Sequence, residues 1–243
     1  MPRFFIDNID NDNKKAYILG EDAKHISKSL RMHTGEKVTL CDCKGYDYIC
    51  TIISINDQYV EVNINDIVIS QSEPNIKVIL YQGLPKGDKM DTIIQKAVEL
   101  GISEIVPVLT NRCVSRPDEK SANKKCQRWQ KISLEAAKQS GRGIIPHINN
   151  IITFKEMIKR INCNDQTIIF YEQGGQSLSN ILNSSRNNIN IIIGPEGGFE
   201  KYEVEQLSEI GANIATLGPR ILRTETAGIA AISAIMYATG NMA

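Results

Sequence analysis

Long apolar runs and metal-binding cysteine patterns are both missing from this sequence of 243 residues. No uninterrupted apolar run has the length of a transmembrane helix, and the opening MPRFFIDNIDNDNKK lacks the apolar core of a secretory signal. The six cysteines include no CxxC pair and the three histidines stand far apart, which argues against a zinc site or a small disulfide framework. We therefore expect a soluble cytoplasmic protein with free thiols, no metal and no membrane partner.

Neither sign of charge is in excess overall, because 28 basic residues balance 28 acidic ones. The balance is uneven along the chain: residues 112–142 contain nine Lys or Arg and three Asp or Glu, an excess of six positive charges. Such a stretch is either the solvated face of a helix or a surface for an anionic partner. Composition alone leaves both interpretations open.

The apolar pattern divides the chain into two halves. Up to residue 72, short apolar or alternating runs such as YVEVNI are broken by Asn, Asp and Gly, which predicts a small β-barrel domain over residues 1–72. One helix is expected inside it at GEDAKHISKSLRM, with Ala23, Ile26 and Leu30 on its apolar side.

From residue 73 onward, strands and helices alternate. The expected strands are IKVILYQ, EIVPVL, TIIFY, INIII and NIATL, and the expected helices are DKMDTIIQKAVELG, CQRWQKISLEAAKQSG and TETAGIAAISAIMYATG. This alternation predicts an α/β domain over residues 73–243, built on a mainly parallel sheet with helices on both faces.

Three loops rich in glycine and polar residues follow predicted strands: YEQGG, GPEGGFE and GPRILRTET. In open α/β sheets, ligands bind beyond the carboxyl ends of the strands, and glycines there let the backbone approach a ligand closely. The G-x-G-x-x-G dinucleotide fingerprint and the phosphate-binding G-x-x-x-x-G-K-[ST] motif are both absent. A pocket of backbone and apolar side chains with few fixed charges suits an adenosine-like ligand with a polar tail.

Two of these segments carry a family resemblance. IIIGPEGGFEKYEV and LGPRILRTETAGIAAISAI resemble the signature segments of the SPOUT-class ribosomal RNA methyltransferases, in particular the RsmE family, which methylates N3 of uridine in small-subunit (16S) ribosomal RNA. GLPKGDKMDTIIQKAVELGISEIVP, NRCVSR, RWQKISLEAAKQSGRGIIP, PRFF and HISKSLRM agree with the same family, so the resemblance covers nearly the whole chain. It implies a trefoil-knotted catalytic domain, a PUA-like RNA-binding barrel, and a homodimer that acts on ribosomal RNA.

The resemblance also implies S-adenosyl-L-methionine as cofactor, bound between the three loops. The residues expected to bind it are Tyr171, Glu172, Gly194, Pro195, Glu196, Gly197, Gly198, Leu217, Gly218, Leu222 and Thr224. The glycines at the GPEGG turn are expected to allow close approach of backbone to the cofactor.

Methylation of uridine N3 requires that the N3 proton leave, because the neutral nitrogen is a poor nucleophile. Arg223, or failing it Arg220, is expected to stabilise negative charge on the uracil carbonyl oxygens. Glu225 is either the proton acceptor or a first-turn residue that suits the helix dipole.

Basic residues are expected to hold RNA phosphates. The candidates are Arg3, Lys28 and Arg31 in the first half, and Arg112, Arg116, Arg128 and Arg142 in the second. His25 and His147 are expected to be structural or RNA-facing. The helix AGIAAISAIMYA is apolar almost all round, which predicts a core position. The family resemblance implies that part of this helix also packs in a two-fold interface.

Two other functions stay open from the sequence. One is a non-catalytic RNA-binding or assembly protein with the same fold, which the intact cofactor segments argue against. The other is an enzyme that binds a phosphate ligand at the glycine turns, which the missing phosphate-loop lysine argues against.

Overall fold

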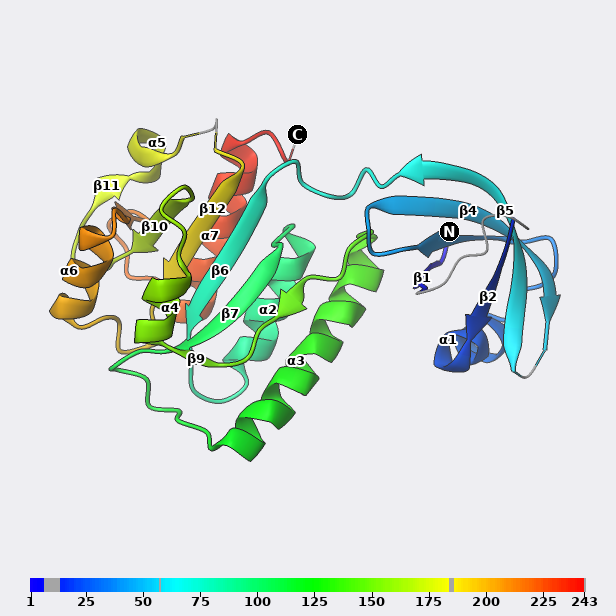
Figure 1. The fold of residues 1–243 in the computed structure, drawn as a ribbon, viewed down its shortest axis with the longest axis horizontal. Helices are drawn as coiled ribbons and strands as arrows, with labels where there is room; N and C mark the ends of the chain where they lie inside the picture. Colours follow the sequence, from blue (N-terminus) through cyan, green and yellow to red (C-terminus); the bar gives the residue numbers. More distant parts are fainter. Residues whose placement is uncertain (7–13, 57, 184–185, 243) are drawn as a thin grey trace. The chain divides into compact units, whose positions relative to one another are not determined.

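The computed structural model describes residues 1–6, 14–56, 58–183 and 186–242. They form two compact units, shown as ribbons in Figure 1. The first consists of Met1–Glu73 together with Ala137–Ile145, and the second of Pro74–Ala136 together with Pro146–Ala243. The inclusion of Ala137–Ile145 in the first unit was not expected from the sequence.

The first unit is built on a five-stranded sheet. Its order is β1 (Arg3–Phe5), β3 (Lys37–Cys41), β4 (Tyr46–Ile55), β5 (Tyr59–Ile69) and β2 (Lys15–Leu19). The β1–β3 pair is parallel and the other pairs are antiparallel. The alternating run YVEVNI lies in β5, where Val60, Val62 and Ile64 point into the core. The predicted PUA-like half of the fold is confirmed.

The helix expected inside this unit is interrupted. It begins as α1 (Gly20–Lys24) and continues as a π-helical turn, η1 (His25–Ser29). Ala23 and Ile26 are buried as predicted, but Leu30 is 41% exposed, so its assignment to the apolar side was wrong. The reason is the wider turn: the amide of Leu30 donates to the carbonyl of His25, five residues back, which rotates Leu30 away from the core.

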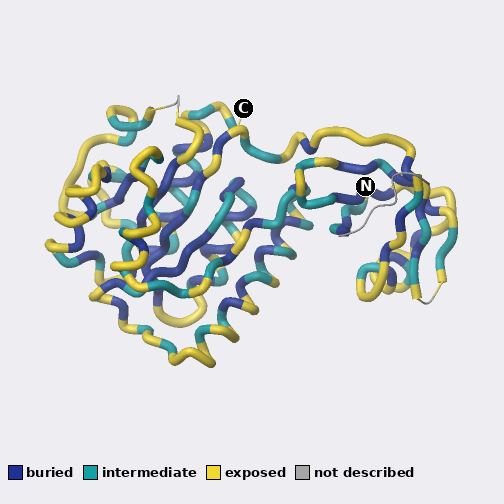
Figure 2. Tube along the Cα trace, in the orientation of Figure 1, coloured by how far each residue is buried: buried dark blue, intermediate teal, exposed yellow. Residues whose placement is uncertain are grey.

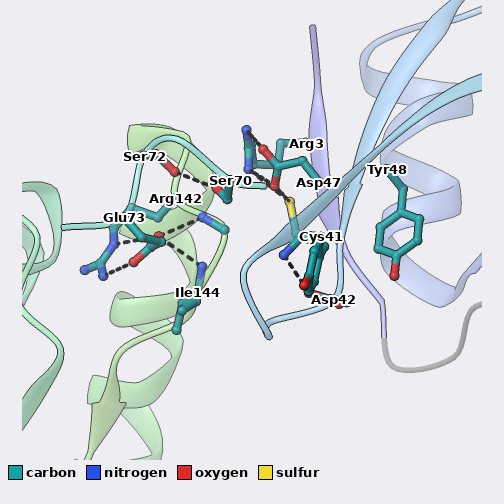
Figure 3. Close-up of polar contacts among 12 residues, drawn as sticks. Arg3, Cys41, Asp42, Asp47, Tyr48, Ser70, Ser72, Glu73, Arg142 and Ile144 are labelled. Atoms are coloured by element: carbon teal, nitrogen blue, oxygen red, sulfur yellow. Dashed lines mark hydrogen bonds and ion pairs between the residues drawn. The ribbon is translucent and has the colours of Figure 1, made fainter. Parts of the chain in front are cut away.

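An ion pair explains why the loop after α3 (Glu119–Ser140) belongs to the first unit. The guanidinium of Arg142 donates to the carboxylate of Glu73 at 2.5 Å, and the amides of Gly143 and Ile144 donate to the same carboxylate at 2.9 and 3.2 Å (Figure 3). One acceptor thus satisfies several donors of the loop, which is the usual condition for a buried charge.

The second unit is built on an eight-stranded sheet in which every pair is parallel. Its order is β11 (Gln176–Ser177), β13 (Asn213–Thr216), β10 (Gln166–Phe170), β12 (Asn188–Ile193), β6 (Lys77–Gly83), β7 (Glu104–Leu109) and β8 (His147–Ile148), and β9 (Ile152–Thr153) also pairs with β7. The mainly parallel sheet predicted for this half is confirmed. Since β10 lies between β12 and β13, the chain leaving β12 must cross β10 before it pairs again.

Helices cover both faces of this sheet. On one face, α4 (Phe154–Arg160) and α6 (Lys201–Glu209) pack on alternate residues of β6, β7, β10 and β12. On the other, α7 (Thr224–Ala238) packs on β6 and β12, and α2 (Lys89–Glu99) packs on α7. Because both faces are covered, consecutive strand residues such as Leu80 and Tyr81 are both buried, and the central strands β6, β7, β10 and β12 are mostly dark blue in Figure 2. A short helix, α5 (Leu178–Ile181), follows β11.

Two consequences of this arrangement bear on function. The carboxyl ends of β6, β10, β12 and β13 lie at one edge of the sheet, so the loops after them converge. No helix within the described residues is both long enough and apolar enough to cross a bilayer.

Candidate functional site

A cavity of about 480 Å³ lies where these loops converge. Every residue expected to bind the cofactor lines it, and so do Arg220 and Arg223. Glu225 is not among the lining residues. The lining residues that sequence reasoning missed are Lys89, Phe170, Ile193, Thr216, Pro219, Ile221 and Ala227. Most of these adjoin predicted residues along the same loops, whereas Lys89 comes from the start of α2, outside the three loops singled out in the sequence.

The GPEGG turn needs glycine at its last position for two reasons. Gly198 has a φ of +68°, a conformation that side chains with a Cβ rarely adopt. A Cβ built on Gly198 would also lie 2.5 Å from Oε1 of Glu172, a residue of the neighbouring loop. The turn is closed by a hydrogen bond from the amide of Gly198 to the carbonyl of Pro195 at 2.9 Å. The glycine therefore lets one wall of the cavity approach another.

A glycine outside the three loops is equally necessary. A Cβ on Gly83, the last residue of β6, would lie 2.5 Å from Cδ of Pro195. Such a distance is shorter than any real Cβ contact, so the GPEGG turn can reach its position only because β6 ends in glycine. Gly83 directly follows the predicted strand IKVILYQ, and this glycine was the feature of the sequence that could have indicated the close approach.

A buried amide connects three elements beneath the cavity. Gln82 is fully buried, and its Nε2 donates to the Thr224 hydroxyl at 2.9 Å. That hydroxyl in turn donates to the carbonyl of Gly194 at 2.6 Å. The ends of β6 and β12 and the start of α7 are thereby held together. Thr224 lines the cavity, and its hydroxyl is already hydrogen-bonded to Gln82 and Gly194.

Two carboxylates share one ammonium group beside the cavity. Nζ of Lys89 lies 2.7 Å from Oε1 of Glu196 and 3.7 Å from Oε2 of Glu225. The hydrogen bond to Glu196 raises the pKa of Lys89. Partial burial would raise the pKa of Glu196, but the hydrogen bonds from Lys89 and from the amide of Lys86 outweigh it and lower that pKa. Lys89 and Glu196 are therefore both ionised near neutral pH.

Glu225 occupies the first turn of α7, as the sequence predicted for a helix start. Within the described residues, the N-cap position of this helix is Arg223, which forms no side-chain cap. Oε2 of Glu225 and Oε1 of Gln82 are the buried side-chain oxygens in the described parts of the chain that lack a hydrogen-bond partner. Both lie beside the cavity, where an unsatisfied acceptor indicates a functional constraint.

Arg112 is bound to the glycine turn. Its guanidinium donates to both oxygens of Glu200 at 3.0 and 3.1 Å and to the carbonyl of Gly197 at 2.9 Å. The hydrogen bond to Glu200 raises the pKa of Arg112, and the same bond lowers the pKa of Glu200. Glu200 precedes α6, whose buried Glu203 accepts from the amide of Asn111 at 2.9 Å. The loop after β7 thus holds the GPEGG turn through two carboxylates and one carbonyl.

Replacing Arg112 with alanine is expected to weaken cofactor binding roughly five- to tenfold, the lower part of the range for coupled sites. The physical reason is that the Gly197 carbonyl and Glu200 lose the fork that orients the turn. The measurement is calorimetric titration with S-adenosylmethionine. The matched control is Arg160→Ala, because Arg160 has the same 38% side-chain exposure as Arg112 and also pairs with a glutamate, Glu104, outside the cavity. Equal affinities in the two variants would contradict a role of Arg112 in orienting the turn.

The arginines of the cavity differ from the others of the second unit. Arg112, Arg116, Arg128, Arg160 and Arg186 all have hydrogen-bonded partners within the protein. Arg220 and Arg223 are exposed at the cavity, and among the described residues neither makes a hydrogen bond or an ion pair. Their guanidinium groups are therefore free to bind a ligand.

Two residues expected to contact RNA have internal partners in the first unit (Figure 3). Arg142 is only 3% exposed and is paired with Glu73, so its assignment to an RNA-facing surface is corrected: the guanidinium points inward. Arg3 donates to both oxygens of Asp47 at 2.8 and 2.9 Å and to the Cys41 sulfur. Burial alone would lower the pKa of Arg3, but the hydrogen bond to Asp47 and the nearby negative charge raise it.

The other RNA candidates lie at the surface. Arg116 donates to the carbonyls of Thr110 and Asn111, and Arg128 pairs with Asp91. Lys28 and Arg31 are exposed and make no ion pair with the residues that the structure describes. These two remain the free cations among the seven candidates.

Comparison with known sequences gives the class of protein. The sequence model described as an RNA methyltransferase domain matches residues 71–236, and that described as an RNA methyltransferase PUA domain matches residues 18–65. The first of these alone covers more than half of the chain and contains the whole cavity. Both descriptions point to one class, the RNA methyltransferases.

Individual relatives narrow this class. The chain is 36% identical to the ribosomal RNA small subunit methyltransferase E of Bacillus subtilis, over 98% of this chain and 97% of the relative. A crystal structure of ribosomal RNA small subunit methyltransferase E from Neisseria gonorrhoeae bound to S-adenosyl methionine matches with a TM-score of 0.89 and 32% identity, covering 98% of each chain. A Legionella pneumophila putative methyltransferase with bound cofactor SAM matches with a TM-score of 0.86 and 29% identity, covering 97% of each. The chain belongs to the ribosomal RNA small subunit methyltransferase E family.

Proposed function

We propose that this protein transfers a methyl group from S-adenosylmethionine to N3 of a uridine in small-subunit ribosomal RNA. The observation that carries the proposal is the cavity of about 480 Å³ at the converging loops, which contains every residue expected to bind the cofactor. The names of the relatives support methyl transfer to the same class of RNA. The proposal places the protein in the cytoplasm, where its substrate is assembled.

The residues of the cavity fit S-adenosylmethionine. Close approach of the GPEGG turn to Glu172, made possible by Gly198, gives a wall of backbone groups. Ile193, Leu217 and Leu222 supply apolar surface for a purine ring, and Glu172 supplies charge for a cationic tail. When bound, the cofactor supplies an electrophilic methyl group on a sulfonium.

The remaining chemistry belongs to residues of this chain. Arg223 is our choice for binding a uracil carbonyl oxygen, because its guanidinium is at the cavity and has no internal partner among the described residues. Charge that develops on that oxygen when the N3 proton leaves is stabilised by a preorganised cation. Glu225 is our choice for the proton acceptor, since its Oε2 has no hydrogen-bond donor among the described residues and lies 3.7 Å from Nζ of Lys89.

Replacing Glu225 with glutamine separates its two possible roles. Loss of a general base is expected to lower turnover on the order of 100-fold and to remove the decline of turnover at acidic pH, because glutamine does not take up a proton. Loss of a favourable helix-dipole charge lowers thermal stability alone. The measurement is the pH profile of single-turnover methylation beside a melting curve. A normal turnover with an unchanged profile would assign Glu225 to the helix.

Association of two copies is part of the proposal. One side of α7 stays partly or fully exposed in the single chain, including Ile229, Ser233 and Tyr237, and Tyr237 is 78% exposed. A helix this apolar is normally covered, and a two-fold contact would bring the same stripe of each copy together. Sedimentation at micromolar concentration that returns a monomer would contradict a homodimer.

Mapping of methylated nucleotides tests the reaction. Small-subunit ribosomal RNA from cells with and without this protein is compared by mass spectrometry, and one methylated uridine is expected to disappear without it. Thermal melting with and without S-adenosylmethionine tests the cofactor separately, because a ligand of the native state raises its stability. Stabilisation by the cofactor without any change in the RNA would favour a non-catalytic binding protein.

A further inference from the structure

Three lysines form an unpaired basic face on α3. Lys120, Lys124 and Lys131 are all exposed, and together with the exposed Gln127 they recur at the three- and four-residue spacing that places side chains on one side of a helix. The opposite side is buried through Cys126, Trp129 and Ser133, at 9%, 3% and 0% exposure. We call the set Lys120, Lys124 and Lys131 the lysine face.

The other cations of α3 already have partners. Arg128 pairs with Asp91, the ammonium of Lys125 lies 5.9 Å from the centroid of the Trp129 ring, and Lys138 pairs with Asp22 at 2.9 Å. The three residues of the lysine face make no hydrogen bond or ion pair in the described part of the chain. Among the described residues, the cations of α3 that lack any such partner are therefore the three of the lysine face.

The position of these charges is unfavourable for the helix itself. Lys120 and Lys124 are like charges four residues apart, an arrangement that destabilises an isolated helix. Lys120 also lies in the first turn, where the helix dipole favours negative charge. Glu135, one turn beyond Lys131, marks the end of the face. Alternating signs of charge are typical of a solvated helix surface, whereas a row of one sign suits a polyanion that lies along the helix.

We propose that the lysine face binds the phosphate backbone of the ribosomal RNA substrate. The proposal rests on the proposed function, which supplies a long RNA as the partner. Phosphate contacts position an RNA without reading its sequence, so flexible lysine ammonium groups are sufficient for this task. The face lies outside the cavity and thus binds RNA away from the target nucleotide.

The test is a triple variant, K120E/K124E/K131E, titrated with purified small-subunit ribosomal RNA at several salt concentrations. Loss of three phosphate contacts is expected to reduce the slope of log affinity against log salt by about 2–3, at 0.7–0.9 per contact. Affinity at low salt is expected to fall at least tenfold. Calorimetric affinity for S-adenosylmethionine is expected to stay within twofold, which also shows that the variant is folded.

A second triple variant provides the matched control. K77E/K155E/K159E makes the same change in charge at exposed lysines of the second unit outside α3. An equal loss of RNA affinity in the two variants would show that the loss comes from the overall charge of the protein and not from the lysine face, and would overturn the proposal. An unchanged salt slope with weakened binding to polyglutamate would instead identify an acidic protein partner, and would also overturn it. Failure of this proposal can be distinguished from failure of the proposed function. If the proposed function is wrong, the native protein will not methylate the RNA, whatever the lysine face binds.

Discussion

Replacing Gly198 with valine is expected to lower the affinity for S-adenosylmethionine at least tenfold. Valine must either adopt a φ near +68° or shift the turn, and a β-branched residue in that region costs about 1–3 kcal/mol, of which 1.4 kcal/mol corresponds to a factor of ten. Its Cβ would also displace the Glu172 carboxylate, which lies 2.5 Å from the position that Cβ must take. Both changes deform the wall of the cavity. Calorimetric titration measures the effect.

Gly211→Val is the matched control for this variant. Gly211 has a φ of +86°, comparable to that of Gly198, but a Cβ there would meet nothing within 4 Å, and the residue does not line the cavity. The Gly211→Val variant should lose stability through backbone strain and keep its affinity for the cofactor. If Gly198→Val binds the cofactor as tightly as Gly211→Val does, the GPEGG turn is not a wall of the binding site.

Replacing Arg223 with lysine is expected to lower single-turnover methylation on the order of 100-fold, the size of effect seen when one donor to a developing oxyanion is removed. Lysine keeps the positive charge but loses the planar fork that can bind a carbonyl oxygen through two donors. Affinities for RNA and for S-adenosylmethionine should change by less than about twofold, the pattern of an interaction formed in the transition state. The melting temperature should not change, since the guanidinium has no internal partner among the described residues.

Arg220→Lys is the informative comparison. Arg220 lines the same cavity, four residues before Thr224, and is likewise exposed without an ion pair within the described chain. A smaller loss of turnover is expected from this variant. Near-normal turnover of Arg223→Lys, together with a large loss in Arg220→Lys, would transfer the anion-stabilising role to Arg220.

The architecture of both halves and the location of the cavity could be predicted from residue patterns along the chain. Alternating apolar residues in YVEVNI and alternating strands and helices after residue 73 reflect local rules, namely side-chain periodicity and helix coverage of a parallel sheet. The GPEGGFE and GPRILRTET loops could be assigned to one site because parallel strands end at a common edge. These inferences depend only on neighbours along the chain or on general sheet geometry.

Which charged side chains are free could not be predicted in this way. Arg3, Arg112 and Arg142 look alike in the sequence, yet their partners Asp47, Glu200 and Glu73 lie 44, 88 and 69 residues away along the chain. Lys89 reaches Glu196 across a separation of 107 residues in the same way. Leu30 lies outside the core because the π-helical turn changes the direction of its side chain. Ion pairs and turn geometry of this kind depend on the three-dimensional placement of distant segments, which residue spacing along the chain does not encode.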